Sequence, residues 1–98
     1  MLFRSGSFNV ANGINALQAN TTGNNNVANG AGSLYLNTTG NFNAANGHEA
    51  LRGNITGYSN TANGYRALYN NTGNNNTATG DSALFLNTTG NFNVAMGS

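Results

Sequence analysis

The sequence predicts an all-β protein whose chain winds as a parallel β-solenoid of about five and a half coils. A phrase that opens with glycine recurs in steps of 17, 17, 17, 16 and 17 residues. Every copy keeps the same residue at several fixed positions, and every copy contains a strand-like stretch followed by turn signals. Because one such copy cannot bury its own apolar face, the copies must stack on one another.

The repeat also predicts the domain organisation. Residues 1–5 form a non-repeat N-terminal segment, and residues 6–98 form one repeat solenoid domain. The 16-residue step is interpreted as the loss of one residue between Tyr69 and Asn70. Neither end of the repeat region has a capping sequence, which predicts either further repeats in a longer parent protein or pairing with other chains. The copies begin at Gly6, Gly23, Gly40, Gly57, Gly73 and Gly90.

Several positions, counted from the opening glycine as position zero, are the same in every copy, and four of them are expected to form the core, a corner and a ladder. Alanine at position five and leucine at position eleven should form the core, and glycine at position seven should form a corner with positive φ. Asparagine at position three should form a ladder of amide hydrogen bonds along the solenoid axis. The core columns are Ala11, Ala28, Ala45, Ala62, Ala78, Ala95, Leu17, Leu34, Leu51, Leu68 and Leu84. The corner glycines are Gly13, Gly30, Gly47, Gly64, Gly80 and Gly97, and the ladder asparagines are Asn9, Asn26, Asn43, Asn60, Asn76 and Asn93.

Each copy is expected to form one coil with a rise of about 4.8 Å. Positions two to six, for example residues 42–46, predict a strand. The Asn-Gly pair that usually follows is a hairpin signal, but it recurs without a mirrored partner strand, so we interpret it as a solenoid corner. Positions eight to thirteen predict either a second short strand or one helical turn, and Asn-Thr-Thr-Gly predicts the second corner.

The composition excludes several classes of function. Charged residues make up 5% of the chain and the net charge is +1, so no basic field would attract nucleic acid. There is no cysteine, which excludes disulfides and thiolate metal sites, and nothing indicates a cofactor. No apolar run is long enough to span a bilayer, so we expect no membrane insertion. No signal peptide is evident, so an extracellular, cell-surface or virion location would need a missing segment, another secretion route or release by lysis.

The repeated phrase resembles that of a known group of surface proteins. The pattern N-x-A-x-G-x-x-A-L, as in Asn26-Val27-Ala28-Asn29-Gly30 and Asn93-Val94-Ala95-Met96-Gly97, is similar to the S-V-A-I-G repeats of trimeric autotransporter adhesin heads. It also resembles the T-G-N-x-N-T-A-x-G-x-x-A-L repeats of phage tail-fibre-like and bacterial surface proteins. This resemblance implies a left-handed β-roll and a homotrimer that binds host matrix or other cells. The present repeat is longer than the adhesin repeat, and asparagine replaces the adhesin isoleucine in four copies.

The residues that could support catalysis are few. His48, Tyr65 and Asp81 share position eight and should form an outward column. His48 and Asp81 would then lie two rungs, or about 9.6 Å, apart, which is too far for a direct hydrogen bond. Glu49 is the other acid, and an outward column offers no pocket, so we expect a solvated variable face and no enzyme. Gly30-Ala31-Gly32 lacks the third glycine and the βαβ context of a nucleotide site.

Two polar columns and the aromatic residues leave alternatives open. Asn-x-Thr sequons could carry glycans along one edge, or their side chains could simply build the second corner. The threonines of position sixteen could form an ice-binding face, although Ile55 and Asn71 break the column beside them. Aromatic side chains such as Tyr35 and Phe42 could contact glycans or pack between chains. The candidate glycosylation residues are Asn20, Asn37, Asn54, Asn70 and Asn87.

The sequence therefore favours a structural or adhesive fibre or head segment that self-associates as a homotrimer. A cell-surface, matrix or glycan ligand is expected on its variable positions. A self-assembling extracellular filament subunit and an ice-binding solenoid remain the alternatives.

Overall fold

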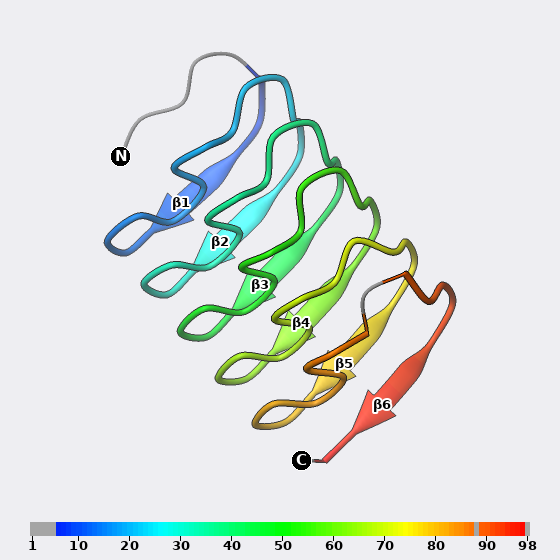
Figure 1. Ribbon diagram of the computed structural model, residues 1–98. Helices are drawn as coiled ribbons and strands as arrows, with labels where there is room; N and C mark the ends of the chain where they lie inside the picture. Colours follow the sequence, from blue (N-terminus) through cyan, green and yellow to red (C-terminus); the bar gives the residue numbers. More distant parts are fainter. Residues whose placement is uncertain (1–5, 88, 98) are drawn as a thin grey trace.

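The computed structural model describes residues 6–87 and 89–97, which form a parallel β-solenoid (Figure 1). Each coil contributes one three-residue strand to a single parallel sheet whose strands follow one another in chain order, and the fold prediction is confirmed. The predicted non-repeat segment, residues 1–5, lies outside the described residues. The strands are β1 (Val10–Asn12), β2 (Val27–Asn29), β3 (Ala44–Asn46), β4 (Thr61–Asn63), β5 (Thr77–Thr79) and β6 (Val94–Met96).

The core of each coil is small and is filled by three positions of the repeat. The strand contributes the alanine of position five, and the opposite side of the coil contributes the leucine of position eleven. Position ten adds a third buried column of small residues, Ala16, Ser33, Ala50, Ala67 and Ala83, which the repeat comparison did not single out. Leu34, Leu51 and Leu68 are completely buried, and each contributes about 1.5–3 kcal/mol of burial free energy.

The predicted asparagine ladder runs through the interior. The Oδ1 atom of Asn43 accepts the backbone N–H of Asn60 at 3.0 Å and its side-chain Nδ2–H at 3.2 Å. The Nδ2 group of Asn43 also donates to Oδ1 of Asn26 at 3.2 Å and to the carbonyl oxygen of Gly57 at 2.8 Å. Each ladder asparagine therefore joins its neighbours and also satisfies backbone groups that the short strands leave without partners.

A second buried ladder lies at position fourteen, and it corrects the predicted place of the missing residue. In this ladder Nδ2 of Asn54 donates to Oδ1 of Asn37 at 2.9 Å. The next member is Asn71, whose side chain is completely buried, whereas Asn70 belongs to the preceding surface turn. The residue lost from the short coil is therefore missing after Asn71, in the second corner, and not between Tyr69 and Asn70.

Positions eight to thirteen form neither of the two predicted structures. In every coil they make a six-residue run of turns, which we call the turn segment. Its backbone N–H groups donate alternately within the coil and between coils: Arg52 donates to Glu49, and Leu51 donates to Ala67. Positions nine and eleven have positive φ, as at Glu49 (59°) and Leu51 (54°), and these left-handed residues interrupt both a strand and a helix.

Two columns of the repeat require glycine, and only one of them also has a positive φ in every copy. At position seven, Gly30 has a φ of 126°, and a Cβ built there would lie 2.5 Å from the carbonyl oxygen of Gly47. At position zero, Gly40 has no positive φ, but a Cβ would overlap the carbonyl oxygen of Gly57 in the next coil. Both columns therefore need glycine because neighbouring coils approach there backbone to backbone.

We predict that Asn43→Ala lowers the free energy of unfolding by more than about 3 kcal/mol. The change leaves the backbone N–H of Asn60 unpaired in the interior, at about 1–3 kcal/mol, and it also removes the side-chain bonds of Asn43 to Asn26, Gly57 and the Asn60 amide. Chemical denaturation followed by circular dichroism measures the loss. Asn46→Ala is the matched control, because its amide bond to Asn63 is exposed and water can replace it. Equal losses for the two variants would contradict the structural role of the ladder.

Candidate functional site

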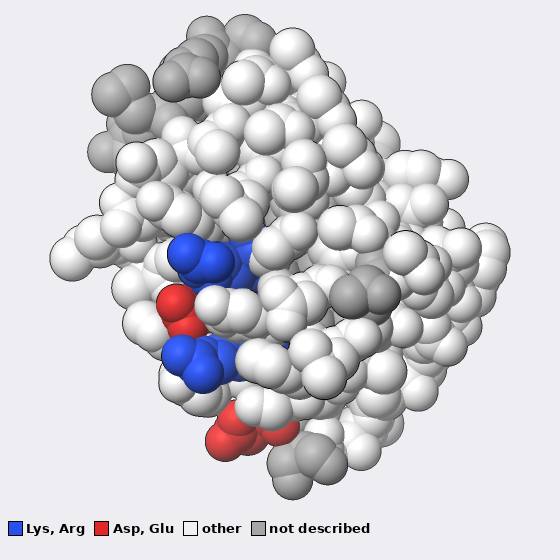
Figure 2. All heavy atoms as spheres, viewed as in Figure 1, with Lys and Arg blue, Asp and Glu red and all other residues white. Residues whose placement is uncertain are grey.

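The charged side chains of the described residues gather on one face of the rod. Figure 2 shows them as a single file on an otherwise uncharged surface. All four, Glu49, Arg52, Arg66 and Asp81, come from positions eight, nine and twelve of the turn segments. We call the surface formed by these three positions the variable face, because the coils differ there in both size and charge.

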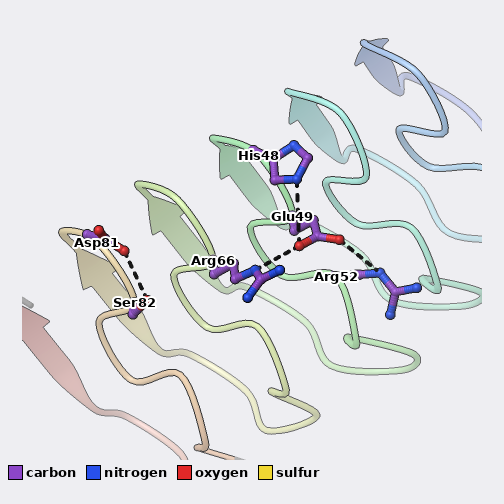
Figure 3. Close-up of polar contacts among 6 residues, drawn as sticks. All are labelled: His48, Glu49, Arg52, Arg66, Asp81 and Ser82. Carbon is purple, nitrogen blue, oxygen red and sulfur yellow. Dashed lines mark hydrogen bonds and ion pairs between the residues drawn. The ribbon is translucent and has the colours of Figure 1, made fainter.

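Glu49 is the centre of the polar contacts on the variable face (Figure 3). Nε of Arg66, in the following coil, donates to Oε1 of Glu49 at 2.8 Å. Nε of Arg52 lies 3.6 Å from Oε2, and Nε2 of His48 lies 3.7 Å from Oε1. The hydrogen bond to Glu49 raises the pKa of Arg66 above its ordinary value, so the guanidinium keeps its charge. The carboxylate is thus held in one orientation by neighbours on two coils.

Rings and guanidinium groups stack in columns along the same face. At position twelve the Arg52 guanidinium lies between the rings of Tyr35 and Tyr69, at 4.9 and 5.7 Å from their centroids. The Tyr69 ring in turn stacks on Phe85, with centroids 4.9 Å apart. Cation–π contacts of this kind fix the arginine side chain, which is 32% exposed. The column is therefore an ordered surface in which one arginine is stacked among three aromatic rings.

A second column at position eight is connected to the first. The rings of His48 and Tyr65 stack with centroids 5.6 Å apart and planes inclined by 9°. The Arg66 guanidinium lies 5.0 Å from the Tyr65 centroid and 5.3 Å from that of Tyr69, so it bridges the two columns. Side chains from successive coils thus form one continuous contact network.

The variable face is hollowed where the second coil carries small residues. Ala31 and Gly32 occupy positions eight and nine there, and the coils on either side carry larger residues at both positions. The result is an open hollow of about 290 Å³. It is lined by Ile14, Asn15, Ala31, Gly32, Tyr35, His48, Glu49 and Arg52.

The two acids considered for catalysis lie in separate contacts. Glu49 is paired with arginines, whereas Asp81 accepts a hydrogen bond from Oγ of Ser82, and no contact joins the two acids in the described part. Residues 30–32 form a corner glycine followed by the floor of the hollow. Within residues 6–87 and 89–97, no group of three or more His, Asp and Glu side chains could hold a metal ion.

The proposed glycosylation residues do not form an exposed row. Asn20, Asn37 and Asn54 are completely buried in the second ladder, so their Nδ2 atoms cannot carry a glycan in this fold. Asn87 is part-buried and donates from Nδ2 to Asn71 at 2.9 Å. Asn70 lies at the partly exposed end of its turn segment and is outside this column. The expectation of a glycan row is therefore corrected, because the amides serve the ladder.

The threonines of position sixteen form a single exposed column at the second corner. The neighbouring column differs, because the Thr21 and Thr38 hydroxyls donate to backbone carbonyls of the following coil at 3.1 and 3.2 Å. Ile55 interrupts this neighbouring column, and the short coil leaves it incomplete. A flat surface with two matched threonine columns is therefore not formed by the described residues.

Comparison of the chain with protein-family models, curated proteins and solved structures finds no match. No helix among the described residues has the length and apolar character needed to cross a membrane. The site is therefore interpreted from its own geometry. The hollow was not predicted, and its sequence signal is the consecutive pair of small residues at positions that are larger in the adjacent coils.

We predict that Glu49→Gln gives a small fall in melting temperature at low salt, and that the fall shrinks in about 1 M sodium chloride. The variant removes the charge that attracts Arg52 and Arg66, which are both partly exposed. Thermal melts at the two salt concentrations measure the effect. Asp81→Asn is the control, because Asp81 forms no ion pair within the described residues. A salt-independent loss would show that packing, and not charge, gives Glu49 its role.

Proposed function

We propose that the chain is a structural and adhesive fibre or head segment. Stacked coils form a stiff rod, and the variable face presents the binding surface. The observation that carries this proposal is the separation of the two kinds of position. The repeated alanine, leucine and asparagine columns lie in the interior, and the residues of positions eight, nine and twelve, which differ between coils, form one ordered face. An arrangement of this kind lets a rod keep its fold while its surface changes.

Hydrogen bonding along the axis supports a stiff rod. Three asparagine positions connect coil to coil through side-chain amides, as in the pairs Asn43–Asn60, Asn37–Asn54 and Asn29–Asn46. No buried side-chain nitrogen or oxygen in the described part lacks a partner. Opening one coil would therefore break several bonds on both of its sides, which resists bending and proteolysis.

Exposed apolar side chains support association of several chains. Phe8, Phe42 and Phe92 at position two are 84%, 64% and 79% exposed. Beside them, position four on the outer side of the sheet carries small residues, including Val27 and Ala44, which allow close approach. Lateral packing of these positions would bury the phenylalanines. We therefore propose a homotrimer built through the sheet, as in the adhesin heads that the sequence resembles, with the variable face directed outward.

We predict that the chain sediments as a trimer and that Ala44→Arg shifts it to a monomer with an unchanged circular dichroism spectrum. An arginine in the middle of the sheet surface would place an unpaired charge in the interface. Analytical ultracentrifugation measures the mass. Thr56→Arg, on the exposed second corner, should remain trimeric. A folded monomeric wild-type chain at high concentration would overturn the trimer, and fibres seen by electron microscopy would favour the filament alternative.

The adhesive role predicts binding that depends on the variable face. Purified chain should bind to at least one of collagen, fibronectin, laminin and a printed glycan array. The double variant Arg52→Ala and Tyr69→Ala should lose at least tenfold in binding, because it removes two adjacent members of the position-twelve column. Thr39→Ala, on the second corner, is the control. Absence of binding to all four probes, or equal binding by the double variant, would contradict an adhesive variable face.

Ice binding is the second candidate, favoured by the exposed threonine column. Against ice binding, the Thr21 and Thr38 hydroxyls in the adjacent column donate hydrogen bonds to backbone carbonyls. Thermal hysteresis of the unmodified chain distinguishes the two functions. Measurable hysteresis that is lost in Thr39→Tyr would favour ice binding over adhesion.

A further inference from the structure

The hollow on the variable face has the form of a slot between two coils. The position-eight column runs from Ile14 through Ala31 to His48 and Tyr65. His48 stacks on Tyr65 with nearly parallel rings, so the other face of the imidazole is directed along the rod toward the second coil. Because Ala31 has only a methyl group, the space between Ile14 and His48 is open, and both residues line the hollow.

The width of this slot is set by the solenoid rise. Ile14 and His48 are two coils apart, which corresponds to about 9.6 Å along the axis. Carbon atoms in contact lie about 3.5–4.0 Å apart, so a flat ring between the two walls would leave about 2 Å unfilled. A puckered six-membered sugar ring, whose atoms and hydrogens lie on both sides of its mean plane, fills such a gap. The hollow of about 290 Å³ lies near the lower end of the range for small-ligand sites, about 300–1,000 Å³.

The rim of the slot offers polar groups to a ring rich in hydroxyls. Glu49 brings carboxylate oxygens, Arg52 brings guanidinium N–H groups, and Asn15 brings an amide. Glu49 is already held by Arg66, and Arg52 is already held between Tyr35 and Tyr69. These groups therefore need little ordering when a ligand binds, which reduces the entropic cost of binding.

We propose that this slot binds one pyranose ring of a glycan, with the apolar side of the sugar against His48 and its hydroxyls on Glu49, Arg52 and Asn15. The inference rests on the proposed function, because it names the ligand class that the adhesive face would hold. The proposed ligand is a single sugar ring inserted between coils. Binding of a matrix protein would instead use the whole variable face.

The test is a titration of the ¹⁵N-labelled 98-residue chain with four simple sugars, followed by heteronuclear NMR. The probes are methyl α-D-glucopyranoside, methyl α-D-mannopyranoside, methyl β-D-galactopyranoside and N-acetyl-D-glucosamine. We expect at least one to give saturable shifts of the Ala31, Gly32 and His48 amide signals, with a Kd on the order of 1 mM. Indole, a flat aromatic probe, should give weaker shifts.

Two variants fill the slot with residues that other coils already carry. Ala31→Tyr introduces the tyrosine that position eight already carries as Tyr65. Gly32→Asn introduces the asparagine that position nine already carries as Asn15, where φ is 65° against 72° at Gly32. Each should weaken sugar binding at least tenfold, and the dispersed spectrum reports whether each variant is folded. Having two independent variants keeps the test decisive if one fails to fold. Asp81→Tyr, the same kind of change away from the slot, should bind as the wild type does.

Three results would overturn the inference. They are the absence of saturable shifts with every sugar, wild-type affinity in a folded slot-filling variant, and tighter binding of indole than of any sugar. These outcomes are separable from failure of the proposed function. A chain that adheres to a matrix protein but binds none of the sugars keeps the adhesive role and loses the slot. A chain that binds a sugar in the slot but fails all four adhesion probes keeps the slot and loses the adhesive role.

Discussion

Hydrogen bonding by buried asparagine amides is the interaction on which this fold depends. Each coil has only three residues of strand, so sheet pairing alone leaves interior backbone groups without partners. Asn43 fills this deficit by accepting from the backbone of Asn60 and donating to the carbonyl of Gly57. Aspartate would lack the donor, alanine would lack both functions, and glutamine would be too long for so narrow a coil. The chemistry of one side chain therefore explains why position three does not vary.

The ladder constrains the structure more tightly than the repeat length does. The fourth coil has one residue fewer, yet Nδ2 of Asn71 still donates to the carbonyl of Gly73, two residues ahead, at 3.0 Å. In the full-length coils the same bond spans three residues, as from Asn37 to Gly40 at 3.2 Å. The corner absorbs the deletion, and the amide column stays continuous from coil to coil. A change of length is therefore tolerated where the backbone turns and both ends of the turn remain hydrogen-bonded.

Comparison of the repeats was enough to predict the solenoid, because residues that contact their own equivalents in the next coil must be similar in size and polarity. It could not predict the backbone of the turn segment. Leucine and arginine rarely adopt positive φ, yet Leu34 has a φ of 49° and Arg66 one of 55°, since neighbouring coils enforce these conformations. The alignment of Asn70 was wrong for a related reason: two adjacent asparagines are indistinguishable until burial separates them. The hollow could not be predicted from a single repeat. It forms from three stacked coils, because Ala31 leaves an open space only where a larger residue such as His48 lies beside it.

The solenoid period decides which surface residues become neighbours. Tyr35 and Arg52, His48 and Tyr65, and Glu49 and Arg66 are each separated by 17 residues, and each pair is in contact. The contacts of a side chain on the variable face therefore depend on the equivalent residues in the adjacent coils. Substitutions there recombine contacts between coils without touching the ladder, because no ladder amide depends on positions eight, nine or twelve. A slot arises where a small residue lies between two larger ones along this column. Rods with the same interior can therefore carry different surfaces.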